Sequence, residues 1–177
     1  MTPSRGMPFR PGSLLVVGLI LLGVGAASVA LWYQQLQTRR CLAFYGTAAA
    51  RRITKAPHVE LWSLAPSGQS GRLVVVGVRD VSTAKGIVHL RRGLVEDAGF
   101  RWADPGPEGR LPAAVWAHAL AFGDAATPGD RTVVVLGLDP QGGWLAVAGQ
   151  PGRVGLGRLG DGLATWLGEI TRDASSP

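Results

Sequence analysis

The sequence predicts an α+β protein: an N-terminal transmembrane helix followed by one antiparallel sheet of about five strands, with helices on one face. Three observations lead to this fold class. Residues 14–32 form a continuous run without a charged side chain. Two valine-rich runs, 73–78 and 133–138, have the composition of buried strands. Segments whose apolar residues recur at helical spacing follow both runs, the second after a further strand.

Residues 13–33 are predicted to form the transmembrane helix. The uncharged run 14–32 rises about 28 Å as a helix, close to the roughly 30 Å hydrocarbon thickness of a bilayer. Trp32 and Tyr33, at the end of this run, are expected at the headgroup level, where aromatic residues act as interfacial anchors. The alternative is a secretory signal cleaved after Ala30, where small residues fit a peptidase site. The length of the apolar run, and its continuation beyond this residue, favour an uncleaved signal anchor.

The segments on either side of the apolar run carry the positive charge. Residues 1–12 are predicted to be a disordered tail. Residues 34–57 are predicted to form a basic juxtamembrane helix, with its apolar residues on one arc and most of its cations opposite. The apolar residues are Leu36, Leu42, Ala43, Ala49, Ala50 and Ile53. We expect the cations to contact anionic lipid, the alternative being a solvated face of the first domain helix. The cations are Arg39, Arg40, Arg51, Arg52 and Lys55.

The remaining residues, 58–177, are enough for one α+β domain. The whole chain has a formal net charge of +6, but all 12 acidic residues lie in this domain, which is therefore nearly neutral. A nucleic-acid-binding domain would need a basic patch of its own, so nucleic acid is excluded as the expected partner. The single cysteine excludes an internal disulfide framework. We expect the lipid bilayer and an unidentified protein as partners.

The domain is predicted to have the element order α-ββα-βββα. Two hairpins, 58–79 and 118–139, each contain a turn-rich loop. The first is followed by a helix capped by Ser82 or Thr83, in which Ile87, Leu90, Leu94 and Val95 recur at helical spacing. The second is followed by a strand at 144–148 and a glycine-rich loop at 149–160. Asp161 is expected to cap the last helix, whose apolar stripe is Leu163, Trp166, Leu167 and Ile170. The region 103–110 is expected to be a loop.

The two hairpins align without a gap at an offset of sixty residues. His58 aligns with His118, Trp62 with Phe122, and Gly77 with Gly137, which indicates a tandem ββα repeat. In this interpretation Val75 and Val135 lie buried in neighbouring central strands, covered on both faces for part of their length.

Few residues indicate chemistry. His58 and Glu60 are two apart, so on a strand they share a face, and with His118 they form a hypothetical metal or catalytic site. The alternative is that these histidines are half exposed at a sheet edge. Cys41 follows two arginines, which would favour a reactive thiolate, although a buried thiol is the simpler interpretation. The glycines of 155–160 match G-x-G-x-x-G, but no βαβ unit surrounds them, so we interpret them as a loop.

No residue is therefore assigned to catalysis, a cofactor or a metal. The sequence favours a single-pass membrane protein whose domain is a non-enzymatic interaction or accessory module. The alternatives are a membrane-tethered enzyme using the histidines and Glu60, and an exported ligand-binding domain released by signal cleavage. The positive-inside rule compares Arg39 and Arg40 after the helix with Arg5 and Arg10 before it, and the two further arginines at the edge of the window favour a cytoplasmic domain over an exported one.

Overall fold

The computed structural model describes residues 11–67, 72–102, 116–124, 126–127, 129–138 and 143–173. Residues 1–10 of the predicted tail and the predicted loop 103–110 lie outside these ranges. The chain divides into two compact units, Met1–Gln37 and Thr38–Pro177.

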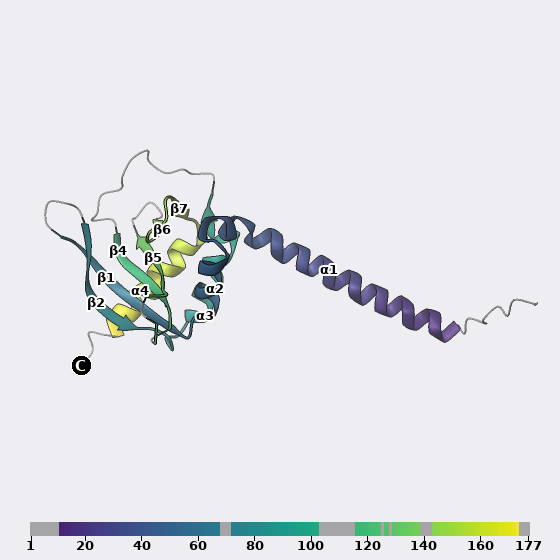
Figure 1. The fold of residues 1–177 in the computed structure, drawn as a ribbon. Coiled ribbons are helices and arrows are strands. Elements are labelled where there is room, and N and C mark those ends of the chain that lie inside the picture. The colour runs from purple at the N-terminus through teal and green to yellow at the C-terminus, as the bar shows by residue number, and fades with distance from the viewer. Residues whose placement is uncertain are drawn as a thin grey trace, which may run out of the picture. The chain divides into compact units, whose positions relative to one another are not determined.

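The described part of the first unit belongs to helix α1, Pro11–Tyr45, drawn in purple and dark blue in Figure 1. Over residues 15–33 its large apolar side chains are exposed, and the Ser28 hydroxyl donates to the Val24 carbonyl at 2.8 Å, which satisfies it within the helix. Among the described residues, α1 is the one helix that is both long enough and apolar enough to cross a membrane. A signal sequence has the same property. The helix continues past Tyr33, the predicted end of the membrane segment.

The second unit contains one antiparallel sheet of seven strands in the order β2-β1-β4-β5-β6-β7-β3. The strands are β1 (His58–Ser67), β2 (Arg72–Asp80), β3 (Phe100–Arg101), β4 (Trp116–Gly123), β5 (Thr132–Gly137), β6 (Trp144–Val147) and β7 (Arg153–Leu156). The α+β class with a single antiparallel sheet is confirmed. The two strands beyond the predicted five are β3, which has two residues, and β7, which lies inside the predicted glycine-rich loop.

Helices α2 (Thr47–Lys55), α3 (Ile87–Val95) and α4 (Arg158–Asp173) pack on one face of the sheet, and a 3-10 turn, η1 (Asp97–Gly99), follows α3 (Figure 1). Alternate strand residues point to this face and form the core with the helices. They include Val59, Leu61, Leu120, Phe122, Val134, Leu136, Leu145, Val147, Val154 and Leu156. The helical stripes predicted for α3 and α4 are buried as expected, through Leu90, Leu94, Leu163 and Leu167 among others.

The helix starts differ from the predicted caps. Helix α3 begins after Gly86, whose φ of 86° is a left-handed conformation that glycine adopts without strain, and not at Ser82 or Thr83. Helix α4 begins at Arg158, three residues before the predicted cap Asp161.

The predicted single helix over 34–57 is interrupted at Gly46, where φ is 76°. The interruption changes the phase of the apolar pattern. Ala49, Ala50 and Ile53 are buried as expected on α2, but Leu36 and Leu42 are exposed, and on α1 the buried residues are Cys41 and Tyr45 instead.

The position predicted for the first valine-rich strand is wrong. Strand β2 is an edge strand, separated from β5 by β1 and β4. Val75 is 46% exposed, and Val135 is partly buried. The two hairpins meet through β1 and β4, and this arrangement leaves β2 on the outside.

The ungapped repeat also fails at the level of the side chains. Phe122 lies in the core opposite Val59, whereas Trp62 pairs with Ala119 on the other face of the sheet. Residues that the repeat treats as equivalent therefore point to opposite faces. A register difference of one residue inverts every side chain of a strand, so the two hairpins are not copies in this alignment.

Candidate functional site

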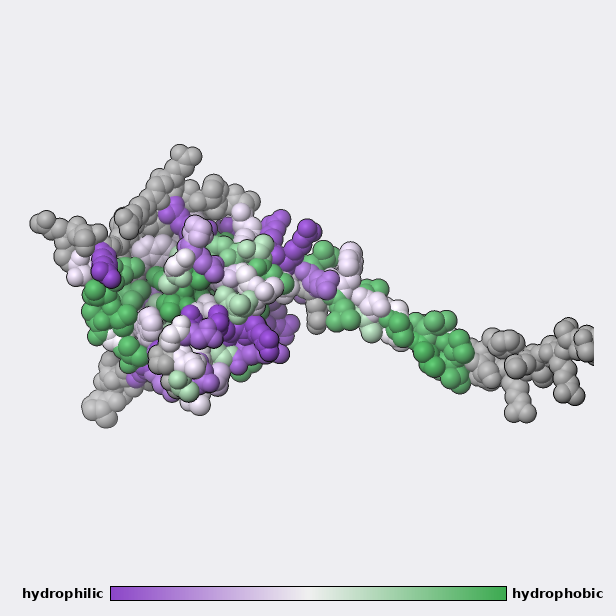
Figure 2. All heavy atoms as spheres, in the orientation of Figure 1, coloured by the Kyte–Doolittle hydropathy of each residue, from purple (hydrophilic) through white to green (hydrophobic). Residues whose placement is uncertain are grey.

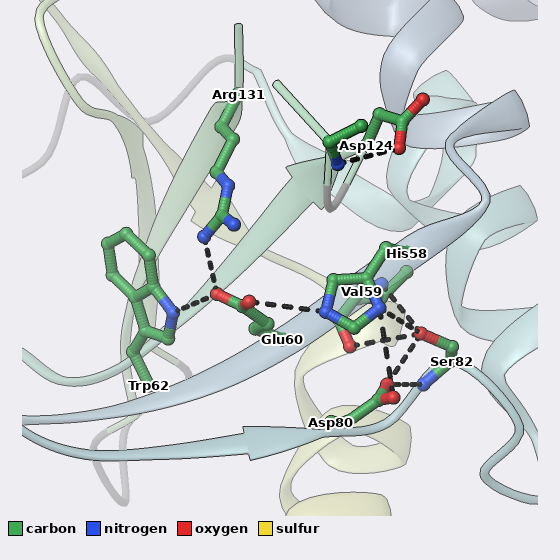
Figure 3. A network of polar contacts seen from close by, with 9 residues as sticks. His58, Val59, Glu60, Trp62, Asp80, Ser82, Asp124 and Arg131 are labelled. Atoms are coloured by element: carbon green, nitrogen blue, oxygen red, sulfur yellow. Dashed lines mark hydrogen bonds and ion pairs between the residues drawn. The ribbon is translucent and has the colours of Figure 1, made fainter. Parts of the chain in front are cut away.

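Strand β1 and the turn after β2 hold a polar network around His58 and Glu60 (Figure 3). His58 Nε2 lies 3.2 Å from Glu60 Oε1, and His58 Nδ1 lies 3.2 Å from the Ser82 hydroxyl. The predicted shared face of His58 and Glu60 is confirmed. Asp80, the last residue of β2, belongs to the same network, because its Oδ2 lies 3.7 Å from His58 Nδ1.

Glu60 is the most strongly held group of this network. Its side chain is 14% exposed, and its Oε2 accepts bonds from Trp62 Nε1 at 2.9 Å and Arg131 Nη1 at 2.7 Å. Burial alone would raise the pKa of the Glu60 carboxyl, but the bonds from Trp62, Arg131 and His58 outweigh it and lower the pKa below its ordinary value. The carboxylate is therefore ionised at neutral pH and fixed from three sides.

The contacts Ser82–His58–Glu60 have the composition of a hydrolase triad, but not its arrangement. The Ser82 oxygen accepts the Val59 N–H at 2.9 Å and lies 2.5 Å from Asp80 Oδ1. The hydroxyl proton is thus directed at the Asp80 carboxylate, whose pKa it lowers together with the Ser82 N–H. A nucleophilic serine needs its proton directed at the base, so this geometry ties β1 to the turn after β2 and does not activate Ser82.

His118 does not join this network. In the antiparallel pair of β1 and β4, His58 lies opposite Gly123, and His118 lies opposite Ser63. Five residues along a strand separate the two positions by about 17 Å, far more than two ligands of one metal allow. The described residues contain no group of three or more His, Cys, Asp or Glu side chains arranged to hold a metal ion. The hypothetical site of His58, Glu60 and His118 is therefore wrong. His118 is instead partly buried within the domain, and this burial lowers its pKa.

The end of α1 is attached to the domain by Asp97. Its carboxylate accepts the backbone N–H of Arg40 at 2.9 Å and that of Cys41 at 2.8 Å. Cys41 is fully buried, and burial, followed by the neighbouring Asp97, raises the pKa of its thiol far above the usual range. The interpretation of Cys41 as a reactive thiolate is therefore wrong, and the interpretation as a buried thiol is confirmed.

The predicted membrane-contacting cations differ in their surroundings. Arg39, Arg40, Arg51 and Lys55 are exposed. Arg52 is partly buried and forms an ion pair with Asp130 in the loop between β4 and β5, so its charge is compensated within the domain. Trp32 and Tyr33 are exposed on α1. Whether any of these residues contacts a membrane stays a prediction.

One feature that the sequence did not indicate is the free edge at β2, on whose outer side no strand of the described residues pairs. Val75, Val76 and Val78 are exposed along it, and Figure 2 shows hydrophobic side chains gathered on the part of the domain where Figure 1 places β1 and β2. The sequence signal was the valine run itself, which is as typical of a buried strand as of an edge that binds another strand.

No protein-family model, no curated protein and no solved structure matches this chain. Its function is therefore argued from its own residues alone.

Proposed function

We propose that this chain is a single-pass membrane protein whose α+β domain binds an extended segment of a partner protein along the free edge of β2. The exposed edge is the observation that carries the proposal. Natural edge strands are usually short, or are protected by charged residues, proline or β-bulges. The opposite edge, β3, has two residues, whereas β2 has nine; it has one bulge, at Val76, and its middle, 73–78, carries no charged residue and no proline.

The edge also defines the partner segment. Backbone N–H and C=O groups on an edge strand bind any added strand, and the side chains decide which one. Strand β2 is apolar in its middle, with Arg72 at its start and Asp80 at its end. A complementary segment is extended and apolar in its middle, with an acidic residue beside Arg72 and a basic one beside Asp80.

Membrane attachment is the second part of the proposal. It is supported by the length and composition of α1, by Trp32 and Tyr33 at the end of the apolar run, and by the exposed cations that follow. We propose a retained signal anchor with the domain in the cytoplasm, because more Lys and Arg residues follow the apolar run than precede it. An intact mass that includes the apolar run, and retention in membranes after alkaline carbonate washing, are the expected results. A mature chain that begins at Leu31 would contradict them.

The side of the membrane needs a separate measurement. Reporters fused after Pro177 should give fluorescence from a cytoplasm-only reporter and no alkaline phosphatase activity. The reverse pattern would place the domain outside, and exchange of Arg39 and Arg40 for Gln should shift the wild-type pattern toward export.

The partner is tested with a photocrosslinking amino acid at Val76, which is 64% exposed, in full-length protein in membranes. The control position is Val88, which is 73% exposed on α3, a helix that packs against α2 and α4. We expect a discrete crosslink at Val76 to an extended apolar segment, absent at Val88. Val78→Lys should abolish it and Val88→Lys should not. A product of two copies of this chain, or no product at Val76, would contradict the proposal.

A further inference from the structure

A groove of about 310 Å³ lies between the last turns of α1 and helix α2, entirely within the second unit. Cys41 and Leu42 line it from α1, Ala50 from α2, and Val95 from the end of α3. Its volume is at the lower end of the range of about 300–1,000 Å³ typical of small-molecule sites. The walls are mainly apolar, and the Cys41 thiol in them is neutral and inert.

Two cationic side chains line this groove. Arg51 and Lys55 are four residues apart on α2, so they share one face of the helix, and both are exposed. The structure gives neither of them an ion pair among the described residues, in contrast to Arg52 between them, which pairs with Asp130. No acidic side chain lines the groove. An apolar groove with two cations that form no ion pair among the described residues is complementary to an apolar chain that ends in an anion.

The groove is also close to the proposed bilayer. Thr38, at its α1 end, follows Tyr33 by five residues, so the two can be separated by no more than about 18 Å even if the chain between them were fully extended. A lipid of the adjacent leaflet can therefore reach the groove without leaving the membrane completely.

We propose that this groove binds one acyl chain of an anionic phospholipid, with its phosphate between Arg51 and Lys55. The inference rests on the proposed membrane anchor. It assigns the cations two different roles: Arg39 and Arg40 act on the surface in general, whereas Arg51 and Lys55 recognise one lipid. The acyl chain leaves one apolar environment for another, so selectivity comes from the headgroup.

The test uses full-length protein in vesicles of zwitterionic lipid that contain a small fraction of phosphatidic acid with a photoreactive acyl chain. After irradiation, flotation separates vesicle-bound protein, and mass spectrometry locates the label. We expect label on Leu42, Ala50 or Val95. The double variant Arg51→Gln/Lys55→Gln should lower groove labelling by roughly 25-fold, since each surface cation contributes about a five-fold preference. The matched control, Arg39→Gln/Arg40→Gln, removes the same charge outside the groove and should retain most of it.

A second pair of variants fills the groove without changing charge. Thr54 lines the groove, and its hydroxyl bonds the carbonyl four residues earlier; Thr165 on α4 does the same on an exposed surface. Thr54→Trp should abolish groove labelling, and Thr165→Trp should leave it unchanged. Equal labelling of both charge variants, or label restricted to residues 14–33, would overturn the proposal.

Two further outcomes are separable in the same samples. If excess glycerol 3-phosphate removes the label, the site binds a soluble phosphate and the lipid assignment is wrong. If the protein does not float with the vesicles, the membrane anchor itself fails. If it floats but the groove is not labelled, only the lipid site fails.

Discussion

Removal of the Asp97 carboxylate should detach the end of α1 from the domain. Asp97 accepts two backbone N–H groups, from Arg40 and Cys41, and a hydrogen bond to a charged group contributes about 1.5–3 kcal/mol. Because both bonds use one partly buried carboxylate, they are not fully additive. We expect Asp97→Ala to lower the free energy of unfolding by about 3 kcal/mol. Urea unfolding in detergent, followed by tryptophan fluorescence, measures this loss.

Cys41 provides a local readout of the same change. It is the only cysteine of the chain and is fully buried, so it reacts with an alkylating reagent only when this region opens. A loss of about 3 kcal/mol corresponds to a rise of roughly 100-fold in the open population, and the alkylation rate should increase accordingly.

The matched control is Glu96→Gln. The charge of Glu96 also raises the pKa of the Cys41 thiol, but its carboxylate pairs with the exposed Arg92 and not with the backbone of α1. An exposed pair of this kind contributes about 0.3–0.5 kcal/mol, so this variant should unfold almost as the wild type does. If Asp97→Ala matched Glu96→Gln in both stability and alkylation, the attachment by Asp97 would be refuted.

Two further predictions concern the sheet. Because the pKa of Glu60 is lowered, its ionised form stabilises the fold at pH values above the ordinary pKa of 4.5. This contribution is lost as the pH falls below that value. Glu60→Gln should therefore show a shallower loss of stability than the wild type in acid unfolding curves. An unchanged acid slope would count against the network of Figure 3. Gly143 has a φ of 73°, and a Cβ there would lie 2.7 Å from the Gly137 carbonyl oxygen, so Gly143→Ala should cost more than about 1 kcal/mol in thermal unfolding. Gly162 on α4 has open space, so Gly162→Ala should instead stabilise by about 0.5–1 kcal/mol, and equal effects of the two changes would contradict this reasoning.

The fold class was predictable because it depends on periodicity. The apolar stripes of α3 and α4 follow from spacings of three and four residues, and the structure buries Leu94 and Leu167 as that spacing requires. The stripe over 34–57 failed because it assumed one continuous helix. Gly46 interrupts that helix with a positive φ, so the residues before and after it do not share one helical wheel: those after it are buried as predicted, but Leu36 and Leu42 before it are exposed.

The candidate site was less predictable, for reasons of sequence distance. Glu60 is held by Arg131, and Cys41 is packed beside Asp97, at separations of 71 and 56 residues. Local pattern does not report such contacts. The pairing of His58 with Glu60 was predictable because strand geometry alone places residues two apart on one face.

The order of the strands in the sheet was also not predictable from the sequence. The observed order can be tested by making the same change, Val→Asp, at three positions that differ in burial. A valine run reads the same in an edge strand as in a central one, since only the neighbours of the strand decide how many of its faces and edges are covered. Val134 lies fully buried on the helix-covered face of β5, Val135 lies half buried on the other face, and Val75 is largely exposed on β2. An unpaired carboxylate in a core costs several kcal/mol, whereas at an exposed edge the cost is about 0.5 kcal/mol or less. We therefore expect Val134→Asp to prevent folding, Val135→Asp to lower the melting temperature, and Val75→Asp to leave it nearly unchanged, as measured by circular dichroism of full-length protein in detergent. Equal loss of folding in Val75→Asp and Val134→Asp would mean that the Val75 side chain is buried, which would contradict the exposed edge on which the proposed function depends.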